Sequence, residues 1–524
     1  MSSPNPSRAA GQQAASAYIQ RSQVRTTNML NATDIASNIS ADLYINGNFT
    51  AGRGDSPIVV TNPYDNRQIA ALPPASADQV DEAVEAAQYA FRRPSWQGLT
   101  GRERGALLSR LARLLERDAE IFAGLESLDT GIPIRETRME VATSALHLEY
   151  FAGFAGKIEG SSQDLGSRFN YVRREPYGVI GQIVPWNTPL KLMTRGFGAA
   201  VACGNTMVVK PSAVAPLSVL RFARIVDEAG FPPGTVNFVF GSGRTVGKAI
   251  VEHPRVRKVI FTGGGEGGYE ILQQAARTVT PTVLELGGKG PIIVCDEIDW
   301  AEALDGVLTQ AFARKAEVCF AGSRLYLPRR MEAEFVAELG AKAARIPLGD
   351  PLDPATQLGP LMTPQRVEDI LTVVKDSVKQ GAHVYCGGEK PRAPGLVQGN
   401  FLAPTILTQV TNQMAVAREE LFGPVLCVIP YDELGEAIDM ANDSDFGLAA
   451  YVWCNDIRKS HRIAHALESG NVFLNSYGYQ SEIPFGGYKL SGMGREHGAE
   501  AMREYTQVKS VTVGMERFKS RFTV

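Results

Sequence analysis

The chain has 524 residues, of which 44% are hydrophobic and 21% charged, which is typical of an ordinary globular protein of two or three domains. Its formal net charge of -3 gives no reason to expect a nucleic acid or a membrane surface as partner, and no apolar run reaches membrane-spanning length. The 6 cysteines are scattered and the 6 histidines show no metal-ligand spacing beside them, so we expect reduced thiols and no metal site.

Residues 1–33 carry Arg8, Arg21 and Arg25 and no acidic residue. They are rich in Ser, Ala, Asn and Gln, a composition typical of a disordered tail, although an organelle transit peptide is the alternative. The apolar core of a secretory signal is missing. We therefore interpret residues 1–40 as a disordered tail or a targeting segment, and we expect a cytoplasmic protein, or a mitochondrial one if the segment is a transit peptide.

The first ordered elements are expected near Leu43. Residues 43–49 have the pattern of a strand, an Asn-Gly turn and a second strand. Ser76 and Gln79 have the spacing of a capping box, and apolar residues at helical spacing follow them. A second amphipathic helix is expected over residues 101–126. This first section predicts a helical layer around a core that later residues supply.

From residue 178 onward, short apolar strands alternate with helices. Strands are expected over residues 179–184, 207–209, 236–240 and 258–261, and a helix over 217–229. This alternation indicates an open parallel sheet, in which ligands bind outside the carboxyl ends of the strands. Lys210, Gly243 and Gly263 fall at such ends. A second α/β run covers residues 288–487, and residues 505–513 alternate like a strand that pairs either with another subunit or with the home sheet.

Three polar segments supply groups for covalent chemistry on a carbonyl. Cys319 is followed by Ala321-Gly322, where the backbone can approach closely and the N–H of residue 319 can donate to an oxyanion. Glu285 lies between two leucines at the end of an apolar strand, which favours a raised pKa suited to a general base. Asn187 follows Pro185-Trp186 and can offer its amide to the same oxyanion. Taken singly, these residues would be a buried thiol, a surface acid and a turn former.

Together these segments resemble the aldehyde dehydrogenase superfamily over about residues 43–513. The matching runs are Pro185-Trp186-Asn187, Lys210-Pro211-Ser212, Phe261-Thr262-Gly263, Leu284-Glu285-Leu286-Gly287-Gly288-Lys289, Cys319-Phe320-Ala321-Gly322-Ser323-Arg324, Gly349-Asp350-Pro351, Glu419-Glu420-Leu421-Phe422-Gly423-Pro424 and Pro484-Phe485-Gly486-Gly487-Tyr488-Lys489. The resemblance implies an α/β fold. It has a Rossmann-type parallel-sheet cofactor domain (41–157 and 177–287), a second α/β catalytic domain (288–487) and a small β extension for oligomerisation (158–176 and 488–524). A homodimer or homotetramer is implied as well.

The resemblance also implies NAD(P)-dependent oxidation of a small-molecule aldehyde to a carboxylic acid. Cys319 would attack the aldehyde carbon, the Asn187 amide and the residue 319 N–H would hold the oxyanion, and hydride would leave to the nicotinamide. Glu285 would then activate the water that hydrolyses the thioester. Lys210 would reach the adenine-side ribose, Glu420 the nicotinamide ribose, and the diphosphate would lie at a helix N-terminus. The implied cofactor-binding residues are Ile183, Trp186, Lys210, Gly243, Gly263, Gly264, Glu420 and Phe422.

Two departures from the family pattern bear on cofactor and nucleophile. Ala213 stands where many NAD-preferring relatives carry Glu, so we expect NADP to be at least tolerated and give the cofactor as NAD or NADP. Arg314 and Ala316 replace the Asn and Gly that usually precede the nucleophile. If that glycine needs a positive φ, Ala316 strains the loop by about 1 kcal/mol. Arg314 can instead lower the thiol pKa or attract an anionic substrate.

Arg195, eight residues after Asn187, falls where semialdehyde-oxidising relatives hold the distal carboxylate of the substrate. A guanidinium suits a carboxylate through two parallel hydrogen bonds. We therefore predict substrate binding by Arg195, Tyr477 and Ser481, with Tyr477 and Tyr479 as an aromatic wall, and a semialdehyde bearing a carboxylate as substrate. The alternatives are an arginine tied to a structural acid, an aromatic or medium-chain aldehyde, a catalytically impaired member with a structural or binding role, and a CoA-acylating dehydrogenase, which Glu285 disfavours.

Overall fold

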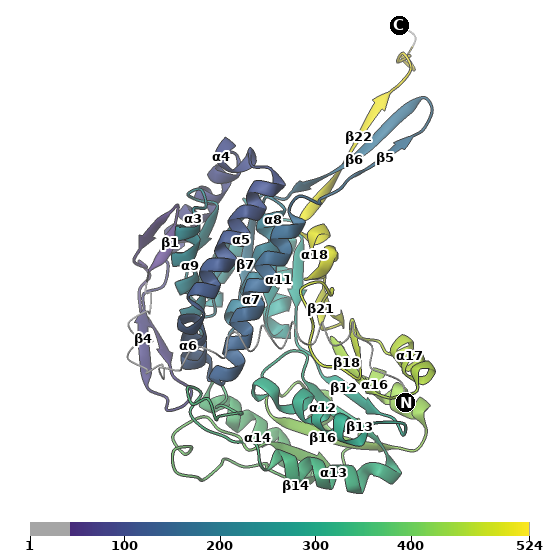
Figure 1. The fold of residues 1–524 in the computed structure, drawn as a ribbon. Helices are drawn as coiled ribbons and strands as arrows, with labels where there is room; N and C mark the ends of the chain where they lie inside the picture. The colour runs from purple at the N-terminus through teal and green to yellow at the C-terminus, as the bar shows by residue number, and fades with distance from the viewer. Residues whose placement is uncertain (1–41, 523–524) are drawn as a thin grey trace, which may run out of the picture.

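A computed structural model describes residues 42–522 of the chain. The expected tail or targeting segment, residues 1–40, lies outside the described residues. Two large sheets flanked by helices, and a projecting three-stranded arm, make up the architecture (Figure 1). The expected α/β class with parallel-strand sheets is confirmed. Within residues 42–522, no helix is both long and apolar enough to cross a membrane.

The first sheet places its parallel strands in an order that opens a crevice. Its spatial order is β2 (Asn48–Thr50), β1 (Leu43–Ile45), β9 (Val236–Phe238), β8 (Thr206–Lys210), β7 (Val179–Ile183), β10 (Val256–Thr262), β11 (Thr282–Glu285) and β21 (Gly492–Met493). The strands from β9 to β11 are parallel, β1 is antiparallel to both of its neighbours, β2 and β9, and β21 is antiparallel to β11. The chain runs outward from β7 through β8 and β9, then returns to β10. Ligands bind where the order reverses, here at the carboxyl ends of β7 and β10.

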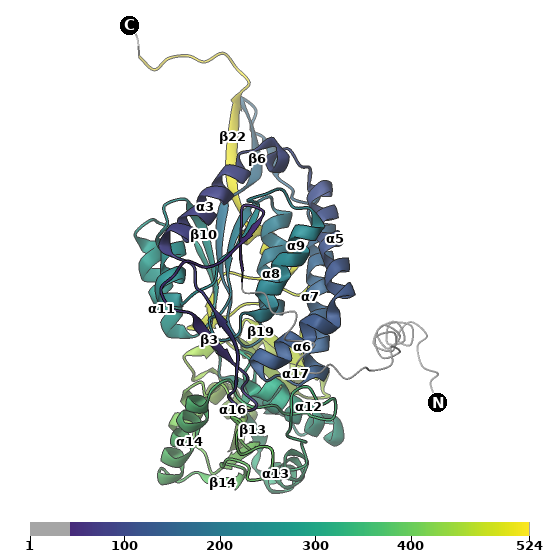
Figure 2. The ribbon, with the colours of Figure 1, turned by 90° about the vertical axis from the view of Figure 1, so that its left-hand side faces the viewer.

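Helices cover both faces of this sheet because successive strand residues point to opposite sides. Ile180 and Met207 pack with one group, comprising α5 (Gly101–Arg117), α7 (Ile134–Phe154), α8 (Pro189–Ala202) and α9 (Leu217–Ala229). Val179 and Val208 pack with the other, comprising α3 (Ala77–Phe91), α10 (Lys248–Glu252) and α11 (Gly265–Ala276). Figure 2 shows α11 on the opposite side of β10 from α8 and α9.

The predicted helix boundaries hold in two places and fail in one. Ser76 and Gln79 form the expected capping box at the start of α3, and α9 spans the predicted residues 217–229. The single helix expected over 101–126 is wrong, because α5 ends at Arg117 and α6 (Ala119–Thr130) begins after Asp118. Asp118 has φ -96° and ψ 16°, and its carboxylate accepts a hydrogen bond from Arg117. The bend turns the buried half of α6 into the core, a tertiary effect that local periodicity does not report.

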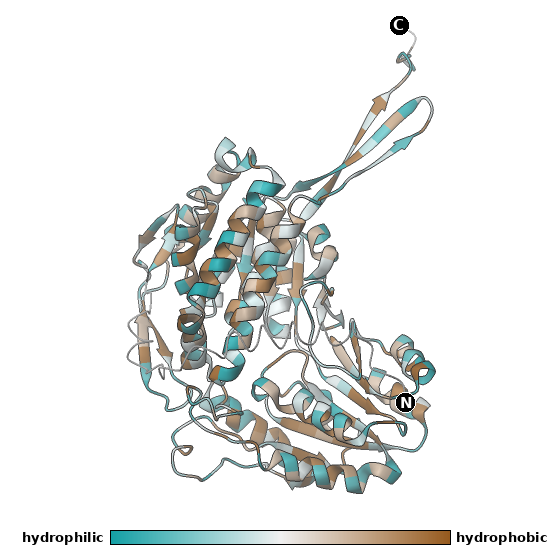
Figure 3. Cartoon of the chain, viewed as in Figure 1, coloured by the Kyte–Doolittle hydropathy of each residue, from teal (hydrophilic) through white to brown (hydrophobic). Residues whose placement is uncertain are grey.

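The second sheet is formed by the later part of the chain. Its spatial order is β14 (His383–Cys386), β15 (Thr405–Thr408), β16 (Val425–Tyr431), β13 (Gly322–Pro328), β12 (Gly290–Val294), β18 (Ala449–Trp453) and β19 (Asn471–Leu474), with only β14 antiparallel. Its helices are α12 (Trp300–Phe312), α13 (Arg329–Ala343), α14 (Pro364–Lys379), α15 (Ala415–Arg418), α16 (Leu434–Asn442) and α17 (Ile457–Ala466). Hydrophobic residues run along these strands, whereas α5 carries many hydrophilic residues (Figure 3).

The terminal strand β22 (Thr506–Gly514) pairs along its whole length with β6 (Arg168–Pro176) of its own chain. With β5 (Ser161–Asp164) these strands form the arm, which projects away from both large sheets (Figure 1). The predicted terminal strand therefore exists, but it joins neither large sheet. The remaining short elements are β3 (Ile58–Thr61), β4 (Gln68–Leu72), α4 (Pro94–Gln97), η1 (Gly243–Gly247), η2 (Ala313–Ala316), β17 (Phe446–Gly447), β20 (Tyr488–Lys489) and α18 (Gly498–Glu504).

Candidate active site

Cys319 lies in residues 313–321, which we call the Cys319 loop, between α12 and the amino end of β13. All six cysteines are free thiols, and only Cys319 and Cys386 are partly exposed. Burial and the nearby Glu285 charge raise the pKa of the Cys319 thiol to about 12, while Arg195 acts to lower it. The thiol therefore needs a proton acceptor close by before it can act as a nucleophile.

Glu285 ends β11 at the carboxyl edge of the first sheet. Its side chain is 1% exposed, and neither carboxylate oxygen has a hydrogen-bond partner among the described residues. Nη2 of Arg195 lies 3.9 Å from Oε2. Burial raises the pKa of Glu285 to about 8, against the lowering effect of Arg195. A carboxyl group with this pKa can take up and release a proton near neutral pH, as a general base must.

Asn187 follows β7 and precedes α8, again at the carboxyl edge of the first sheet. Its Nδ2 donates a hydrogen bond of 2.9 Å to the carbonyl oxygen of Glu317, two residues before Cys319. An amide nitrogen carries two hydrogens, so one remains for an oxyanion. On the other side, a β-carbon on Gly288 would lie 2.5 Å from the Cys319 carbonyl oxygen. The structure thus brings the segments of Cys319, Glu285 and Asn187 together where the two sheet edges face each other.

Ile183 and Lys210 are partners in the register between β7 and β8. A β-carbon on Gly247 would lie 3.8 Å from Ile183 and 3.7 Å from Lys210, so both side chains face η1. The Lys210 ammonium donates to the Pro211 carbonyl oxygen at 2.8 Å, and burial lowers its pKa to about 8. Because an ammonium has three donors, Lys210 can also serve a ribose hydroxyl.

Glycines open the space between Lys210 and α11. Gly264 is the extended N-cap residue of α11, directly after Gly263. A β-carbon on Gly243 or Gly264 would meet nothing within 4 Å. The first N–H groups of α11 therefore face open space, which suits a diphosphate.

Glu420 lies beside the Cys319 loop. Its Oε1 accepts a hydrogen bond from the Gly288 N–H at 2.8 Å, and burial raises its pKa to about 7. A β-carbon on Gly287 would lie only 2.0 Å from this carboxylate, so the close approach requires glycine. The rings of Trp186 and Phe422 lie 5.4 Å apart. The residues predicted to bind a dinucleotide thus lie at the carboxyl ends of β7, β8 and β10 and beside the Cys319 loop, and their donors and glycine space fit such a group.

Arg195, the predicted substrate clamp, is fully buried in α8 and ion-paired with Glu496. Its Nη2 also approaches Thr262 Oγ1 at 3.4 Å, and its guanidinium lies 5.6 Å from the centre of the Phe485 ring. The charge of Arg195 is therefore already matched by Glu496. This pairing favours the alternative of an arginine tied to a structural acid.

The predicted aromatic wall lies next to the residue after Cys319. The Phe320 ring centroid is 5.7 Å from that of Tyr477 and 5.3 Å from that of Tyr479. Tyr479 also contacts Phe485, with centroids 4.7 Å apart. Ser481 is buried nearby, where its carbonyl oxygen accepts a hydrogen bond from the Gly498 N–H at 2.8 Å.

Sequence reasoning missed three buried charged residues on this side of the site: Glu140, Lys191 and Glu496. Lys191 Nζ lies 2.9 Å from Glu140 Oε2, and Glu496 is the partner of Arg195. A signal was present in α8, which carries Lys191 and Arg195 one helical turn apart in an otherwise apolar and wholly buried sequence. Two buried cations require buried acids, but no local pattern says which acids these are.

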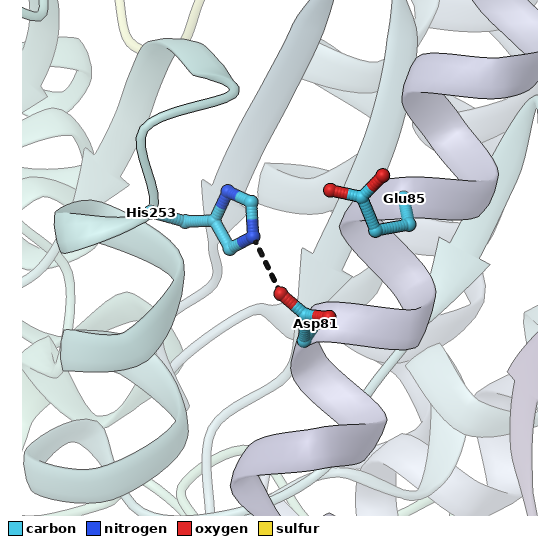
Figure 4. A group of neighbouring side chains, drawn as sticks. All are labelled: Asp81, Glu85 and His253. Atoms are coloured by element: carbon cyan, nitrogen blue, oxygen red, sulfur yellow. Dashed lines mark hydrogen bonds and ion pairs between the residues drawn. The ribbon is translucent and has the colours of Figure 1, made fainter.

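Asp81, Glu85 and His253 form a group that could geometrically hold an ion (Figure 4). The His253 ring approaches Asp81 Oδ1 through Nε2 at 3.1 Å, and its Nδ1 accepts the Arg255 backbone N–H at 3.1 Å. A backbone N–H can only donate, so the neutral ring carries its hydrogen on Nε2, where a metal would bind. Glu85 pairs with the Arg255 side chain at 2.5 Å. These contacts fasten α3 to the end of α10.

Comparison with known proteins agrees with this geometry. The model of the aldehyde dehydrogenase family matches residues 49–511. The Bacillus subtilis (strain 168) protein DhaS, described provisionally as an aldehyde dehydrogenase, is 39% identical over 477 residues, covering 90% of this chain and 96% of DhaS. Two solved structures cover 94% of this chain. One is betaine aldehyde dehydrogenase from Staphylococcus aureus in complex with NAD+, at 34% identity, TM-score 0.92 and 99% of its own chain. The other is a variant of aldehyde dehydrogenase from Bacillus cereus, at 38% identity, TM-score 0.90 and 100% of its own chain.

The family match spans most of the chain, and the folds superpose along nearly their whole length. The chain belongs to the aldehyde dehydrogenase family.

Proposed function

We propose that this protein oxidises a small-molecule aldehyde to the carboxylic acid through a covalent intermediate on Cys319, with NAD or NADP as the hydride acceptor. The observation that carries the proposal is the meeting of Cys319, Glu285 and Asn187 between the two sheet edges. The NAD+ bound in the Staphylococcus aureus relative supports the cofactor assignment.

In the first step, Cys319 loses its proton and its sulfur bonds to the aldehyde carbon. Glu285 is the suited acceptor, since it is close enough to shift the thiol pKa and has a raised pKa of its own. Moving one proton between them leaves a single negative charge where two would repel. The carbonyl oxygen, now an oxyanion, takes the free Asn187 N–H and the residue 319 N–H, each worth about 3 kcal/mol in comparable sites.

The dinucleotide would be held by the Lys210 ammonium, the N-terminus of α11 and Glu420. When bound, its nicotinamide supplies the hydride acceptor. Loss of hydride from the tetrahedral carbon leaves a thioester on Cys319. Glu285 releases the thiol proton to solvent and then removes a proton from water. The water oxygen bonds to the thioester carbon, and the carbon–sulfur bond breaks to release the acid and the Cys319 thiolate, which takes the proton back from Glu285. Glu285 is suited to activate water, which disfavours the acylating alternative, in which CoA takes the place of water.

For the substrate, we infer an aromatic or medium-chain aldehyde. The rings of Phe320, Tyr477 and Tyr479 offer an apolar surface directly beside Cys319. The carboxylate-bearing semialdehyde needs Arg195 to be available, whereas Arg195 is paired with Glu496. A semialdehyde would have to compete with that buried ion pair for the guanidinium.

The test is a panel of neutral and acidic aldehydes, assayed with NAD and with NADP, on the wild type and on Cys319→Ser. We expect acid formation by the wild type, preference for neutral aldehydes, and loss of activity in the variant. Cys386→Ser is the matched control, because Cys386 is the other partly exposed thiol. Iodoacetamide should label Cys319 and abolish activity in parallel. Full activity in Cys319→Ser would refute the mechanism, and acidic aldehydes as best substrates would refute the inferred class.

We further propose that the arm mediates homodimer or homotetramer formation. β22 lies at the edge of the three-stranded sheet, so its second edge is free for pairing in the described chain. Val508 and Val513 on this strand are 59% and 44% exposed. Sedimentation velocity should find an assembly larger than one chain, and Val508→Asp with Val513→Asp should shift it toward the monomer. A wild-type monomer at working concentration would contradict the proposal.

A further inference from the structure

The Cys319 loop contains three consecutive residues in the left-handed region. Arg314 has φ 52°, Lys315 φ 63° and Ala316 φ 56°. Residues with a β-carbon are strained there, and a run of three is unusual because such residues normally occur singly. Position 316 thus has the positive φ that makes alanine a strained replacement. Other contacts must hold this backbone, since the local conformational preference opposes it.

Arg314 is fastened by its backbone and by its side chain. Its N–H donates to Glu136 at 3.3 Å, its guanidinium donates to Glu140, and Nη1 donates to the Tyr477 hydroxyl at 3.3 Å. The next residue is fastened as well. Lys315 Nζ donates to the Thr130 carbonyl oxygen at 2.6 Å and pairs with Glu317 at 2.7 Å. These contacts anchor the first half of the loop to the α6–α7 region.

Glu140 links these contacts to α8. It is 1% exposed on α7, and its second oxygen lies 2.9 Å from Lys191 Nζ. Burial alone would raise the pKa of Glu140, but Arg314 and Lys191 hold it at about 2, so the carboxylate stays ionised. Lys191 lies one helical turn before Arg195 and 4.9 Å from the centre of the Tyr479 ring. A single buried carboxylate therefore joins α7, α8 and the Cys319 loop.

The two roles expected for Arg314 from sequence receive no support from this arrangement. The cation that lowers the Cys319 pKa is Arg195, through its charge. Arg314 faces Glu140 and Glu136 instead of standing free for an anionic substrate. The contacts of Arg314 hold the Cys319 loop against α7.

We propose that Glu140 is a positioning residue, which with Arg314 and Lys191 forms a buried ion triad that holds the Cys319 loop in its left-handed conformation. The triad keeps Cys319 directed toward Glu285 and Asn187. The inference depends on the proposed role of Cys319 as nucleophile.

The experiment measures the second-order rate of Cys319 alkylation by iodoacetamide, and kcat, in Glu140→Gln with and without Ala316→Gly. Without the carboxylate, Arg314 and Lys191 are buried cations with no shared partner, and we expect alkylation and kcat to fall by roughly ten- to a hundredfold. Glycine adopts a positive φ without strain, so Ala316→Gly should restore both rates in the double variant. Ala316→Gly alone should change alkylation less than about twofold, since the triad already holds the loop.

Arg314→Met is the second variant, for the case that Glu140→Gln does not fold. It removes the guanidinium, keeps the apolar stem and leaves the Glu140–Lys191 pair intact, and Ala316→Gly should rescue it in the same way. Lys258→Met is the matched control, because it breaks a buried ion pair with Glu504 between β10 and α18. It should lower Tm and leave the alkylation rate unchanged.

A purely structural role would lower Tm in Glu140→Gln and Arg314→Met without slowing alkylation, and that result would overturn the proposal. So would a rescue of Tm by Ala316→Gly without rescue of the alkylation rate. Failure of the proposed function looks different, because the wild type itself would then show no activity-linked labelling of Cys319.

Discussion

The two sides of Cys319 are built in different ways. On the cofactor side, the carboxyl ends of β7, β8 and β10 offer glycine space, backbone N–H groups and one cation, Lys210. On the substrate side, four charged groups are buried in pairs, Glu140 of α7 with Lys191 of α8, and Arg195 of α8 with Glu496 just before α18. Local backbone geometry forms the cofactor side, whereas ion pairs between residues distant in sequence form the substrate side. We infer that the cofactor side binds the dinucleotide, and we propose that the substrate side determines which proton moves and where the Cys319 thiol points.

Glu285 lies between these two sides, and its replacement should have the largest effect. In Glu285→Gln, the Cys319 proton has lost its acceptor, so loading of the thioester slows, and no base activates water for its hydrolysis. We expect steady-state acid formation to fall by about 10²–10⁴-fold. The diagnostic measurement is stopped-flow absorbance of the reduced cofactor, which should show a slowed burst of at most one per active site and then a near halt. Cys319→Ser should show no burst, and a normal steady state in Glu285→Gln would contradict the role.

The same substitution, Glu285→Gln, also tests how much the buried carboxyl group of Glu285 destabilises the folded protein as the pH rises. The folded-state pKa of Glu285, about 8, lies above its ordinary value. Between these two values the unfolded chain loses the proton while the folded chain keeps it, so wild-type stability falls as pH rises through this window. Gln does not titrate. The Tm difference between Glu285→Gln and wild type should therefore grow in favour of the variant from about pH 5 to about pH 8, and a constant difference would show that Glu285 is not destabilising when ionised.

Arg195→Met separates the two uses of the substrate-side arginine. Because Arg195 lowers the pKa of Glu285, its loss should raise that pKa and shift the pH profile of kcat to more alkaline pH. At pH 7 we expect kcat to fall by about tenfold for every aldehyde, the size of a one-unit shift. Lys258→Met is the control, since it removes a buried cation that pairs with Glu504, away from the contacts of the Cys319 loop, and it should leave the pH profile unchanged. Selective loss of acidic aldehydes would instead restore Arg195 as a carboxylate clamp.

Short motifs were enough to predict the strands and a helix of the cofactor side. The strands ending at Ile183 and Lys210, the helix 217–229 and the parallel pairing all follow from apolar runs with glycine boundaries. The substrate side could be predicted only in part. Arg195 was visible in sequence, but Glu496 follows it by hundreds of positions, and an ion pair over that distance leaves no periodic signal. The bend at Asp118 was also missed, because it depends on the burial of α6 and not on a local sequence pattern.

Ala213→Glu tests the cofactor side, with a smaller expected effect. Ala213 follows β8 and is half-buried. Its methyl group has no charge and no hydrogen-bonding atom, so it neither binds ribose hydroxyls nor repels a 2′-phosphate. Wild-type kcat/KM for NAD and NADP should differ by less than about a hundredfold, or roughly 2.7 kcal/mol. The added carboxylate should lower kcat/KM for NADP by at least about tenfold and leave NAD unchanged or improved. Val214→Glu, one residue further and exposed, is the matched control and should leave the ratio near the wild-type value.

The smallest effect is expected at Asp81, where the hydrogen bond to His253 lies on the surface of the cofactor side (Figure 4). Asp81→Asn removes one charge from a contact in which the Asp81 side chain is 65% exposed, so stability should change by less than about 1 kcal/mol. kcat should not change, because α3 and α10 keep their apolar packing. Glu82→Gln, which breaks the adjacent exposed pair with Arg53, should behave alike.

Titration with Zn²⁺ or Ca²⁺ decides whether Asp81 and His253 only connect α3 to α10 or also bind a cation. The Nε2–H of His253 opposes a metal, so Tm should be the same with the ion and with EDTA, and a Tm increase in wild type that is absent in Asp81→Asn would establish a bound cation instead.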